Sequence, residues 1–247
     1  MAADGRSDDG ATGRRRRKGP PPGPARQFFG RMRGHRLSPA VETAFAAALP
    51  RYGLDLSRSP PSSLAGLFPR PVRDAWLEIG FGMGEHLIHR AAADPGIGFL
   101  GAEPFVNGFA ATVVALAEAG LDNVRLHDRE AAPLLEWLPD GALGRVYVLF
   151  PDPWPKARHR KRRLVSPVTL RRLARVMRPG AELRVATDIG DYVRTTLEAV
   201  GRSGDFRWRA DGPADWRTRW PDWPETKYER KAIAAGRTRY FLTFERC

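Results

Sequence analysis

The apolar positions in the middle of the chain form short runs that alternate with stretches of helical periodicity. Five runs predict buried strands, and they cover residues 74–80, 97–103, 123–127, 144–150 and 181–188. Each run is followed by a segment whose apolar residues recur every three or four positions, as on one face of a helix. Strands and helices that alternate at this spacing predict βαβ units and an α/β protein with a mostly parallel sheet.

The two ends of this pattern carry further signals. Ser38-Pro39 and Ser166-Pro167 each predict a helix start, with serine as N-cap and proline at the first helical position. Residues 205–210 and 238–246 predict two late strands, separated by a stretch rich in Trp and Pro. Residues 1–27 are charged and rich in Gly and Pro, so we predict a disordered basic tail before a single domain that covers 28–247.

Positive charge is concentrated in two places. The formal net charge is +13, residues 1–37 hold ten Lys and Arg against three Asp, and the run 156–163 holds six cations and no acid. Such concentration favours a polyanionic partner, because cations that neutralise phosphates release counterions. The single cysteine, Cys247, excludes a disulfide within the chain and a thiol metal cluster. Without an apolar stretch of membrane-spanning length or a secretory signal, we expect a cytoplasmic protein with no membrane partner.

A glycine-rich turn follows the first predicted strand. Glu78, Gly80, Gly82 and Gly84 form an E-x-G-x-G-x-G pattern at a strand-to-helix junction, where ligands bind in open α/β sheets. A dinucleotide fingerprint would need glycine at position 85, which is Glu85, and an acid there disfavours a pyrophosphate. The pattern therefore favours a nucleoside ligand without phosphate, and S-adenosylmethionine fits this description.

Acids at the next strand ends support a nucleoside ligand. Glu103 closes the second predicted strand, where a carboxylate can accept hydrogen bonds from both ribose hydroxyls. Asp128 and Glu130 follow the third, and either could take an adenine amino group. At the end of the fourth, Pro151, Pro153 and Pro155 stiffen a corner that holds Asp152 and Trp154.

Several stretches in this order resemble the bacterial tRNA (guanine-N7-)-methyltransferase family. The most specific is "LFPDPWPKARHRKRRLV", and the full set covers residues 28–39, 77–87, 101–108, 149–165, 186–188 and 226–237. The resemblance implies a Rossmann-like class I methyltransferase fold, with a seven-stranded sheet and helices on both faces. It also implies S-adenosylmethionine as donor, no metal, and tRNA as partner. The acceptor would be N7 of the variable-loop guanine, guanine 46 in tRNA numbering, and the product 7-methylguanosine.

The resemblance also assigns roles to individual residues. Glu78, Glu103 and Asp152 match acids that contact the donor or flank the methyl-transfer site, with Glu130 favoured over Asp128 although the family usually has Asp in that loop. Lys156 matches a lysine that meets the RNA, and Asp188 matches an acid at the fifth strand end. The substrate segment T-K-[FY]-E is matched by Thr226, Lys227, Tyr228 and Glu229. The position often held by His in the family is Pro155 here, so that side chain cannot be essential for proton transfer.

The expected chemistry needs no general base, because guanine N7 has a lone pair and no proton to lose. We expect Asp152 and Asp188, with Glu229 as a third acid, to stabilise the positive charge that develops on the methylated base. Cations from Lys156 to Arg163, Arg158, Arg160 and Arg162 among them, are expected to bind phosphates, and Trp154 and Tyr228 are candidates to stack on the base. The rival interpretations are a noncatalytic RNA-binding module, a nicotinamide-dependent oxidoreductase, and a methyltransferase for protein or small molecules, which would not explain the run 156–163. The pattern leaves monomer and homodimer open.

Overall fold

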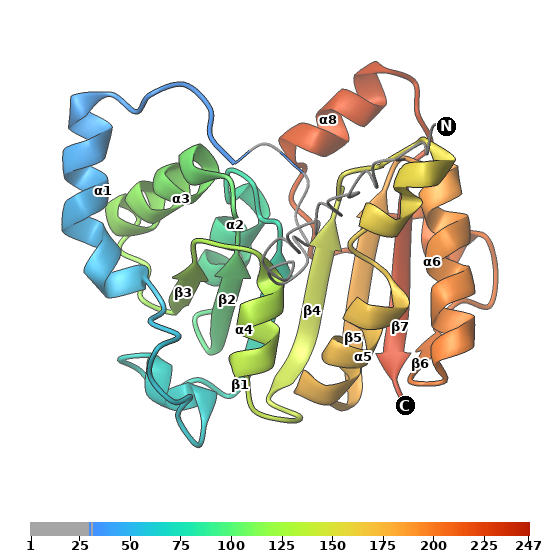
Figure 1. Ribbon diagram of the computed structural model, residues 1–247, viewed down its shortest axis with the longest axis horizontal. Coiled ribbons are helices and arrows are strands. Elements are labelled where there is room, and N and C mark those ends of the chain that lie inside the picture. Colours follow the sequence, from blue (N-terminus) through green and yellow to red (C-terminus); the bar gives the residue numbers. More distant parts are fainter. Residues whose placement is uncertain (1–29, 31) are drawn as a thin grey trace, which may run out of the picture.

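The computed structural model describes residue 30 and residues 32–247, so the predicted tail at 1–27 lies outside the described residues. Its centre is a seven-stranded sheet in the order β3-β2-β1-β4-β5-β7-β6 (Figure 1). Five strands are parallel: β1 (Asp74–Ile79), β2 (Ile97–Ala102), β3 (Val124–His127), β4 (Leu143–Leu149) and β5 (Met177–Thr187). The last strand, β7 (Tyr240–Arg246), runs antiparallel between β5 and β6 (Phe206–Trp208). The prediction of a mostly parallel seven-stranded sheet is confirmed.

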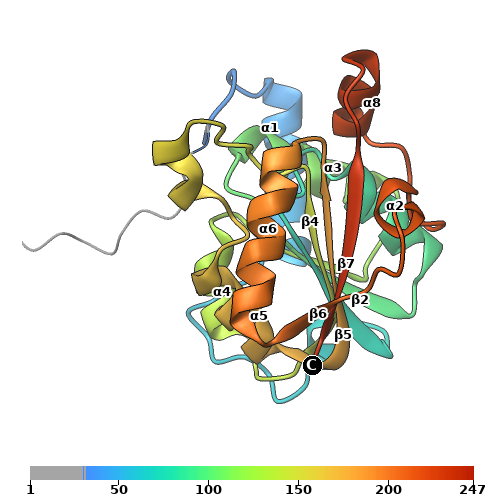
Figure 2. The ribbon, with the colours of Figure 1, turned by 90° about the vertical axis from the view of Figure 1, so that its right-hand side faces the viewer.

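Helices cover both faces of the sheet, as Figure 2 shows. One face carries α2 (Glu85–Ala93) and α3 (Val106–Glu118), and α1 (Pro39–Tyr52) packs on α3 through an edge-to-face contact of Phe45 and Phe109. The other face carries α4 (Ala131–Trp137), α5 (Pro167–Val176) and α6 (Gly190–Ser203). Two separate clusters of buried apolar side chains, one on each face, form the core between these layers. In the sheet, β2 and β3 lie on one side of β1, and β4 and β5 lie on the other. The strand order therefore reverses between β1 and β4, and a crevice opens there.

Local signals placed the helix starts correctly. The Ser38 hydroxyl accepts a hydrogen bond from the backbone N–H of Val41 at 3.4 Å, and Ser166 accepts one from Thr169 at 3.3 Å. Both serines therefore act as N-caps. The first N–H groups of a helix have no partner inside it, so a proline, which has no N–H, fits well directly after each serine.

Four short elements have no counterpart among the predictions. They are η1 (Leu64–Leu67), η2 (Ala157–Arg162), α7 (Ala214–Arg217) and α8 (Lys227–Ala234). Among the residues of α8 only Glu229 and Ala232 are buried, so this helix leaves no apolar stripe in the sequence. A different signal marks it: Thr226 is the N-cap, and an acid follows three residues later.

The Trp- and Pro-rich stretch before α8 packs against the sheet. Trp220 and Trp223 are buried and both contact the ring of Phe241 on β7, with centroids 5.3 and 5.7 Å away. Asp222, between them, forms ion pairs with Arg90 and Arg184. This stretch therefore covers strands that no helix covers on that face, and it carries the chain back to the carboxyl edge of the sheet. Within the described residues, no helix is both long and apolar enough to span a bilayer.

Candidate active site

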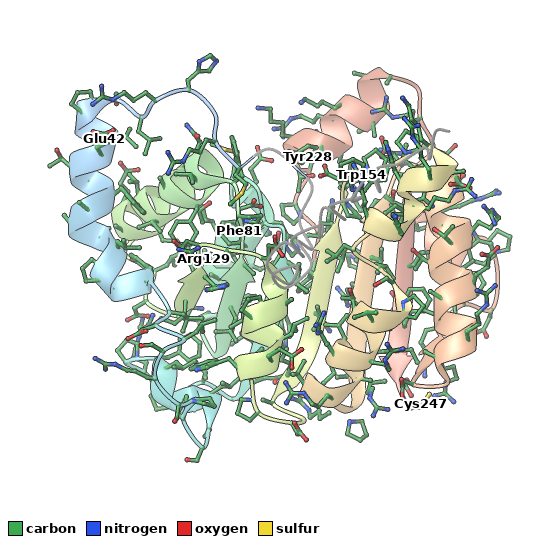
Figure 3. All side chains as sticks on the ribbon, in the orientation of Figure 1. Glu42, Phe81, Arg129, Trp154, Tyr228 and Cys247 are labelled. Carbon is green, nitrogen blue, oxygen red and sulfur yellow. The ribbon has the colours of Figure 1, made fainter. Side chains whose placement is uncertain are left out.

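A cavity of about 650 Å³ lies at the carboxyl ends of the parallel strands, in the crevice where the strand order reverses. Side chains or backbone from the ends of four strands line it. They include Ile79 and Gly80 at the end of β1, Ala102 and Glu103 at the end of β2, Glu130 and Ala131 after β3, and Leu149, Phe150 and Asp152 at the end of β4. Trp154 and Tyr228 line its mouth, and Figure 3 shows both above the carboxyl edge of the sheet. Most of the acids expected at a donor site therefore meet around one space.

Two glycines of the glycine-rich turn, Gly80 and Gly82, line this cavity, whereas Gly84 does not. Gly80 has φ 76°, and a Cβ built on it would meet nothing within 4 Å, so its backbone is open to the cavity. Gly84 also has a positive φ but does not line the cavity, and a Cβ there would lie 2.5 Å from Oγ1 of Thr112 on α3. The missing side chain of Gly84 permits close packing against α3, and its contact with a ligand stays a prediction.

Glu103 fastens the glycine turn to the end of β2. Its two carboxylate oxygens accept backbone N–H groups, one from Gly82 at 2.7 Å and the other from Phe105 at 2.8 Å. The side chain is buried, and desolvation, the largest effect, raises the pKa of Glu103. The carboxylate is thus held in a fixed orientation at the cavity wall, and each oxygen keeps a lone pair for a further donor.

Glu78 lies below the cavity and does not line it. Its Oε2 is 2.7 Å from Nδ1 of His86, and both side chains are about 3% exposed. The ring of His86 in turn packs between Tyr147 and Trp223 at centroid distances of 4.6 and 5.0 Å. One oxygen of the Glu78 carboxylate is thus engaged in a buried pair, and the direct contact of Glu78 with a ligand stays a prediction.

The loop after β3 separates the two acids that the sequence left as alternatives. Glu130 is the N-cap of α4 and lines the cavity. Asp128 is exposed, does not line the cavity, and lies 3.8 Å from the guanidinium of Arg129. Figure 3 labels Arg129 beside this loop. The geometry therefore favours Glu130 as the acid that reaches a bound nucleoside.

The proline-rich corner holds Asp152 at the cavity wall through a strained backbone. Phe150 and Trp154, on either side of it, have φ of 47° and 41°, where bulky residues are rarely found. Each such residue costs on the order of 1–3 kcal/mol and persists only where the surroundings enforce it. Although part of Asp152 is open to solvent, desolvation at the wall raises the pKa of its carboxyl.

Trp154 is already in contact with the basic run. The guanidinium carbon of Arg162 lies 4.9 Å from its ring centroid, and the ring of His159 meets it edge-on at 5.9 Å. A cation over the ring face stabilises this arrangement. Trp154 is therefore held in place by the loop that it precedes, and one of its faces is covered.

The basic run is folded as η2, and its cations do not all face solvent. Lys156 and Arg158 are exposed, whereas Arg163 is buried and donates to Asp191, to Thr195 and to the carbonyl of Pro153. Arg163 is thus a structural residue, which corrects the expectation that the whole run binds phosphates.

Asp191 at the start of α6 anchors η2 to the domain. Arg160, Arg163 and Arg194 all donate to its carboxylate at 2.7–2.9 Å. The hydrogen bonds from Arg194 and Arg163 lower the pKa of Asp191 to about 2. Arg160 is therefore only partly available to an anionic partner.

Asp188 and the segment at α8 do not meet the cavity as a group. Asp188 accepts from Nε of Arg237 at 2.5 Å and does not line the cavity. Thr226 caps α8, with its hydroxyl 3.3 Å from the N–H of Glu229. Glu229 is 1% exposed, and its carboxylate is 2.7 Å from Nε1 of Trp223. The polar groups of these three residues are engaged within the protein, and their catalytic or substrate-binding roles stay predictions.

Tyr228 is the member of this segment that reaches the cavity, and Lys227 beside it is exposed. A contact that the sequence did not reveal involves Glu85, whose carboxylate lies against the first turn of α8. The two partners are 142 residues apart in the chain, so no local pattern could have paired them. In residues 30 and 32–247, no group of three or more His, Cys, Asp or Glu side chains is arranged to hold a metal ion.

A family model and individual known proteins both match this chain, and they agree with each other. A family model described as "Putative methyltransferase" matches residues 73–242. A protein of Ruegeria pomeroyi named tRNA (guanine-N(7)-)-methyltransferase is 49% identical over 232 residues, which is 92% of this chain and 97% of that protein. A protein of Mesorhizobium japonicum with the same name is 50% identical over 219 residues, 89% of this chain and 94% of that protein.

Solved structures resemble the chain in fold. The aminoglycoside resistance methyltransferase NpmB1 aligns with a TM-score of 0.51 at 18% identity, over 71% of this chain and 88% of that one. An antibiotic-related methyltransferase aligns with a TM-score of 0.51 at 14% identity, over 78% and 99%. At these identities the likeness concerns the fold alone, and it agrees with the class I methyltransferase architecture described above.

Proposed function

This chain belongs to the bacterial tRNA (guanine-N7-)-methyltransferase family, and we propose that it transfers a methyl group from S-adenosylmethionine to N7 of guanine 46 in the variable loop of tRNA. The observation that carries the proposal is the meeting of Glu103, Glu130 and Asp152 around one cavity whose wall continues into the basic element η2. Carboxylates that can bind a cationic nucleoside therefore lie next to the arginines and the lysine of η2, which can bind RNA phosphates.

The cavity residues fit the chemistry of the donor. Glu103, fixed by two backbone N–H groups, accepts hydrogen bonds from the ribose hydroxyls, and Glu130 accepts one from the adenine amino group. The adenine ring lies against the apolar wall that Ala131 and Leu135 provide. The open backbone at Gly80 leaves room for the amino-acid tail. In this arrangement the sulfonium lies toward Asp152, which attracts its positive charge.

The reaction is an in-line displacement at the methyl carbon. The N7 lone pair forms the new N–C bond as the C–S bond breaks, and the sulfur keeps the electron pair of that bond and becomes a neutral thioether. The positive charge passes to the guanine, and no proton is lost. Catalysis therefore depends on positioning and on a carboxylate near the developing charge. Asp152 is favoured for this role over Asp188, which is paired with Arg237.

The acceptor reaches the cavity from the side of η2 and α8. Lys156 and Arg158, exposed beside the mouth, bind phosphates, and Arg162 at the wall and the partly available Arg160 add charge. Tyr228 is 53% exposed at the mouth, whereas Arg162 lies over the ring of Trp154, so Tyr228 is the better candidate to stack on the guanine.

The proposed reaction is tested on an unmodified tRNA transcript incubated with enzyme and donor. Nuclease digestion and mass spectrometry should identify 7-methylguanosine as the product, and chemical cleavage at that nucleoside should place it at position 46. A transcript with adenosine at position 46 is the matched control and should accept no methyl group. A different methylated nucleoside would overturn the reaction, and methylation at another guanine would overturn the position alone.

The assignment of the adenine contact has its own test. Glu130→Gln should weaken donor binding by calorimetry on the order of tenfold, the effect of one lost charge-assisted hydrogen bond. Asp128→Asn, a change of the same kind two residues away and outside the cavity, should leave binding unchanged. Equal effects of the two changes would reject the assignment.

A further inference from the structure

The helix α8 stands at the carboxyl edge of the sheet, above the strands and apart from the two helical layers (Figures 1 and 2). Only two of its eight residues are buried, and one of them is the acid Glu229. Apolar packing does little to fix the position of a helix with so little buried apolar surface. Polar contacts therefore fix where it lies: those of the buried Glu229 with Trp223 and Arg239, and those at the two ends of the helix.

At its amino end the helix is held by Glu85, the first residue of α2. The Oε2 atom of Glu85 accepts the backbone N–H of Lys227 at 2.5 Å, and Oε1 lies 3.1 Å from the guanidinium of Arg230. At the other end, Arg237 just beyond α8 donates to Asp188 after β5. The helix is thus tied to the carboxyl ends of two strands, β1 through the glycine turn and β5 directly.

The position of Glu85 is electrostatically favourable for both helices. It follows Gly84, the N-cap of α2, and it contacts the first N–H of α8. The first N–H groups of a helix have no partner inside it, and a helix N-terminus carries partial positive charge. One carboxylate therefore joins two helix N-termini, while Thr226 satisfies a different first-turn N–H of α8.

The contact between Glu85 and Lys227 lies directly beside Tyr228, a residue that lines the cavity. Tyr228 follows Lys227, lines the cavity, and approaches the glycine turn, since a Cβ built on Gly82 would lie 3.6 Å from Cε2 of its ring. Desolvation, and then the charges of Glu103 and Asp152, raise the pKa of Tyr228. The hydroxyl is therefore neutral at physiological pH, and the ring lies beside the glycine turn at the cavity.

We propose that Glu85 is a positioning residue for methyl transfer: by holding the first turn of α8 on the glycine turn, it keeps the Tyr228 ring over the mouth of the cavity, where the acceptor guanine meets the donor. The proposal rests on the function proposed above. It assigns Glu85 to the geometry of the acceptor and not to the donor pocket, since Glu85 does not line the cavity.

The competing interpretation is a surface ion pair without functional consequence. Glu85 and Arg230 are half exposed, and exposed ion pairs contribute little to stability. Both interpretations therefore expect a small change in melting temperature when Glu85 is removed. They differ in the kinetics, because only a positioning residue acts on turnover through Tyr228.

The test measures kcat, KM for tRNA and melting temperature for Glu85→Ala and Glu85→Gln, each in the wild-type chain and with Tyr228→Ala. We expect Glu85→Ala to lower kcat/KM for tRNA on the order of tenfold, as a displaced positioning group does, with little change in donor affinity or melting temperature. Glu85→Gln keeps an oxygen for the Lys227 N–H and should recover most of the activity. With Tyr228 already removed, Glu85→Ala should have less than about a twofold further effect. Glu198→Ala, which removes another exposed acid paired with an arginine, is the matched control and should change nothing.

Wild-type kcat/KM for Glu85→Ala would overturn the proposal. A double variant whose loss of kcat/KM equals the product of the losses in Glu85→Ala and Tyr228→Ala would also overturn it, because the two residues would then act independently. Hydrogen exchange of the amides at 227–230, measured without tRNA, separates this failure from failure of the proposed reaction. Faster exchange in Glu85→Ala supports the docking of α8 even if the wild-type protein methylates another nucleoside. Unchanged exchange rejects Glu85 as the anchor whatever the substrate is.

Discussion

Glu103 and Asp152, at the ends of β2 and β4 on either side of β1, show how two carboxylates around one cavity differ in their surroundings. Glu103 is buried and oriented by two backbone N–H groups, so it suits a binding role that needs a fixed acceptor. Asp152 sits on a strained, proline-stiffened corner at the mouth, closer to where a base must arrive. Both carboxyl groups have a raised pKa because of desolvation, a common feature of functional sites.

Asp152→Asn should lower kcat on the order of 100-fold, because it removes a charge near the cation that forms in the reaction. The amide is nearly the same size, so the corner should keep its shape and tRNA binding should change little. Single-turnover kinetics and tRNA binding in a filter assay would measure the two effects separately. An Asn variant with wild-type turnover would exclude Asp152 from catalysis.

Donor binding should weaken as the pH falls. A raised pKa means that Glu103 and Asp152 take up protons at a higher pH than ordinary carboxyl groups, and the protonated forms lose the charge that attracts a sulfonium. Affinity should therefore be constant near neutral pH and decline as the pH drops through these raised values. The same two groups make the empty protein less stable as the pH rises through them, since the folded state binds their protons more tightly. Calorimetry at a series of pH values tests the affinity, and Asp152→Asn should remove part of the slope.

At the scale of elements, η2 and α8 decide how the site is presented to an RNA. The element η2 is anchored from below by Arg163 and Asp191, so its exposed cations Lys156 and Arg158 are displayed on a fixed support. The helix α8 is anchored by Glu85 and Asp188 at the opposite side of the mouth. The two elements together frame the entrance through which an acceptor base must pass.

Two arginines only five positions apart, Arg158 and Arg163, should differ in what they contribute: one to tRNA affinity and the other to the stability of the fold. Arg163→Ala removes a buried side chain and leaves partly buried acceptors without their donor, so it should cost about 2 kcal/mol or more of stability, seen as a lower melting temperature. Arg158→Ala should leave the melting temperature unchanged and should reduce the slope of log affinity for tRNA against log salt by about 1. The salt titration and a thermal melt of both variants check this, and a normal melting temperature for Arg163→Ala would contradict the structural role.

At the scale of the whole molecule, the parallel strands bring their carboxyl ends to one edge, and the reversal of strand order between β1 and β4 opens the cavity there. The two apolar clusters on either face of the sheet hold this edge rigid. The Trp- and Pro-rich stretch then returns the chain across one face, so that its last helix meets the turn after its first strand.

Donor binding should therefore stabilise the whole domain. A ligand present at a hundred times its dissociation constant adds about 2.7 kcal/mol, which corresponds to a rise in melting temperature of about 5–10 °C for a protein of this size. Thermal melts with and without S-adenosylmethionine test this, and Glu103→Ala should abolish most of the rise. A similar shift in that variant would place the donor outside the cavity.

The sequence by itself determined the features that depend on local pattern. Apolar runs identified the strands, serine and proline identified the starts of α1 and α5, and the glycine turn with Glu103 identified the edge where the cavity opens, because each is set by residues close together in the chain. The resemblance added the family, which the comparisons confirm.

Only the tertiary structure decided which polar groups are available at that edge. Glu130 reaches the cavity and Asp128 does not, Glu78 is paired with His86, and Arg163 is buried under the basic run. Glu85, which the sequence offered only as an argument against a pyrophosphate, anchors a helix 142 residues away. The reason is physical: a carboxylate or guanidinium is engaged or free according to the partners that packing brings to it, and those partners come from distant parts of the chain.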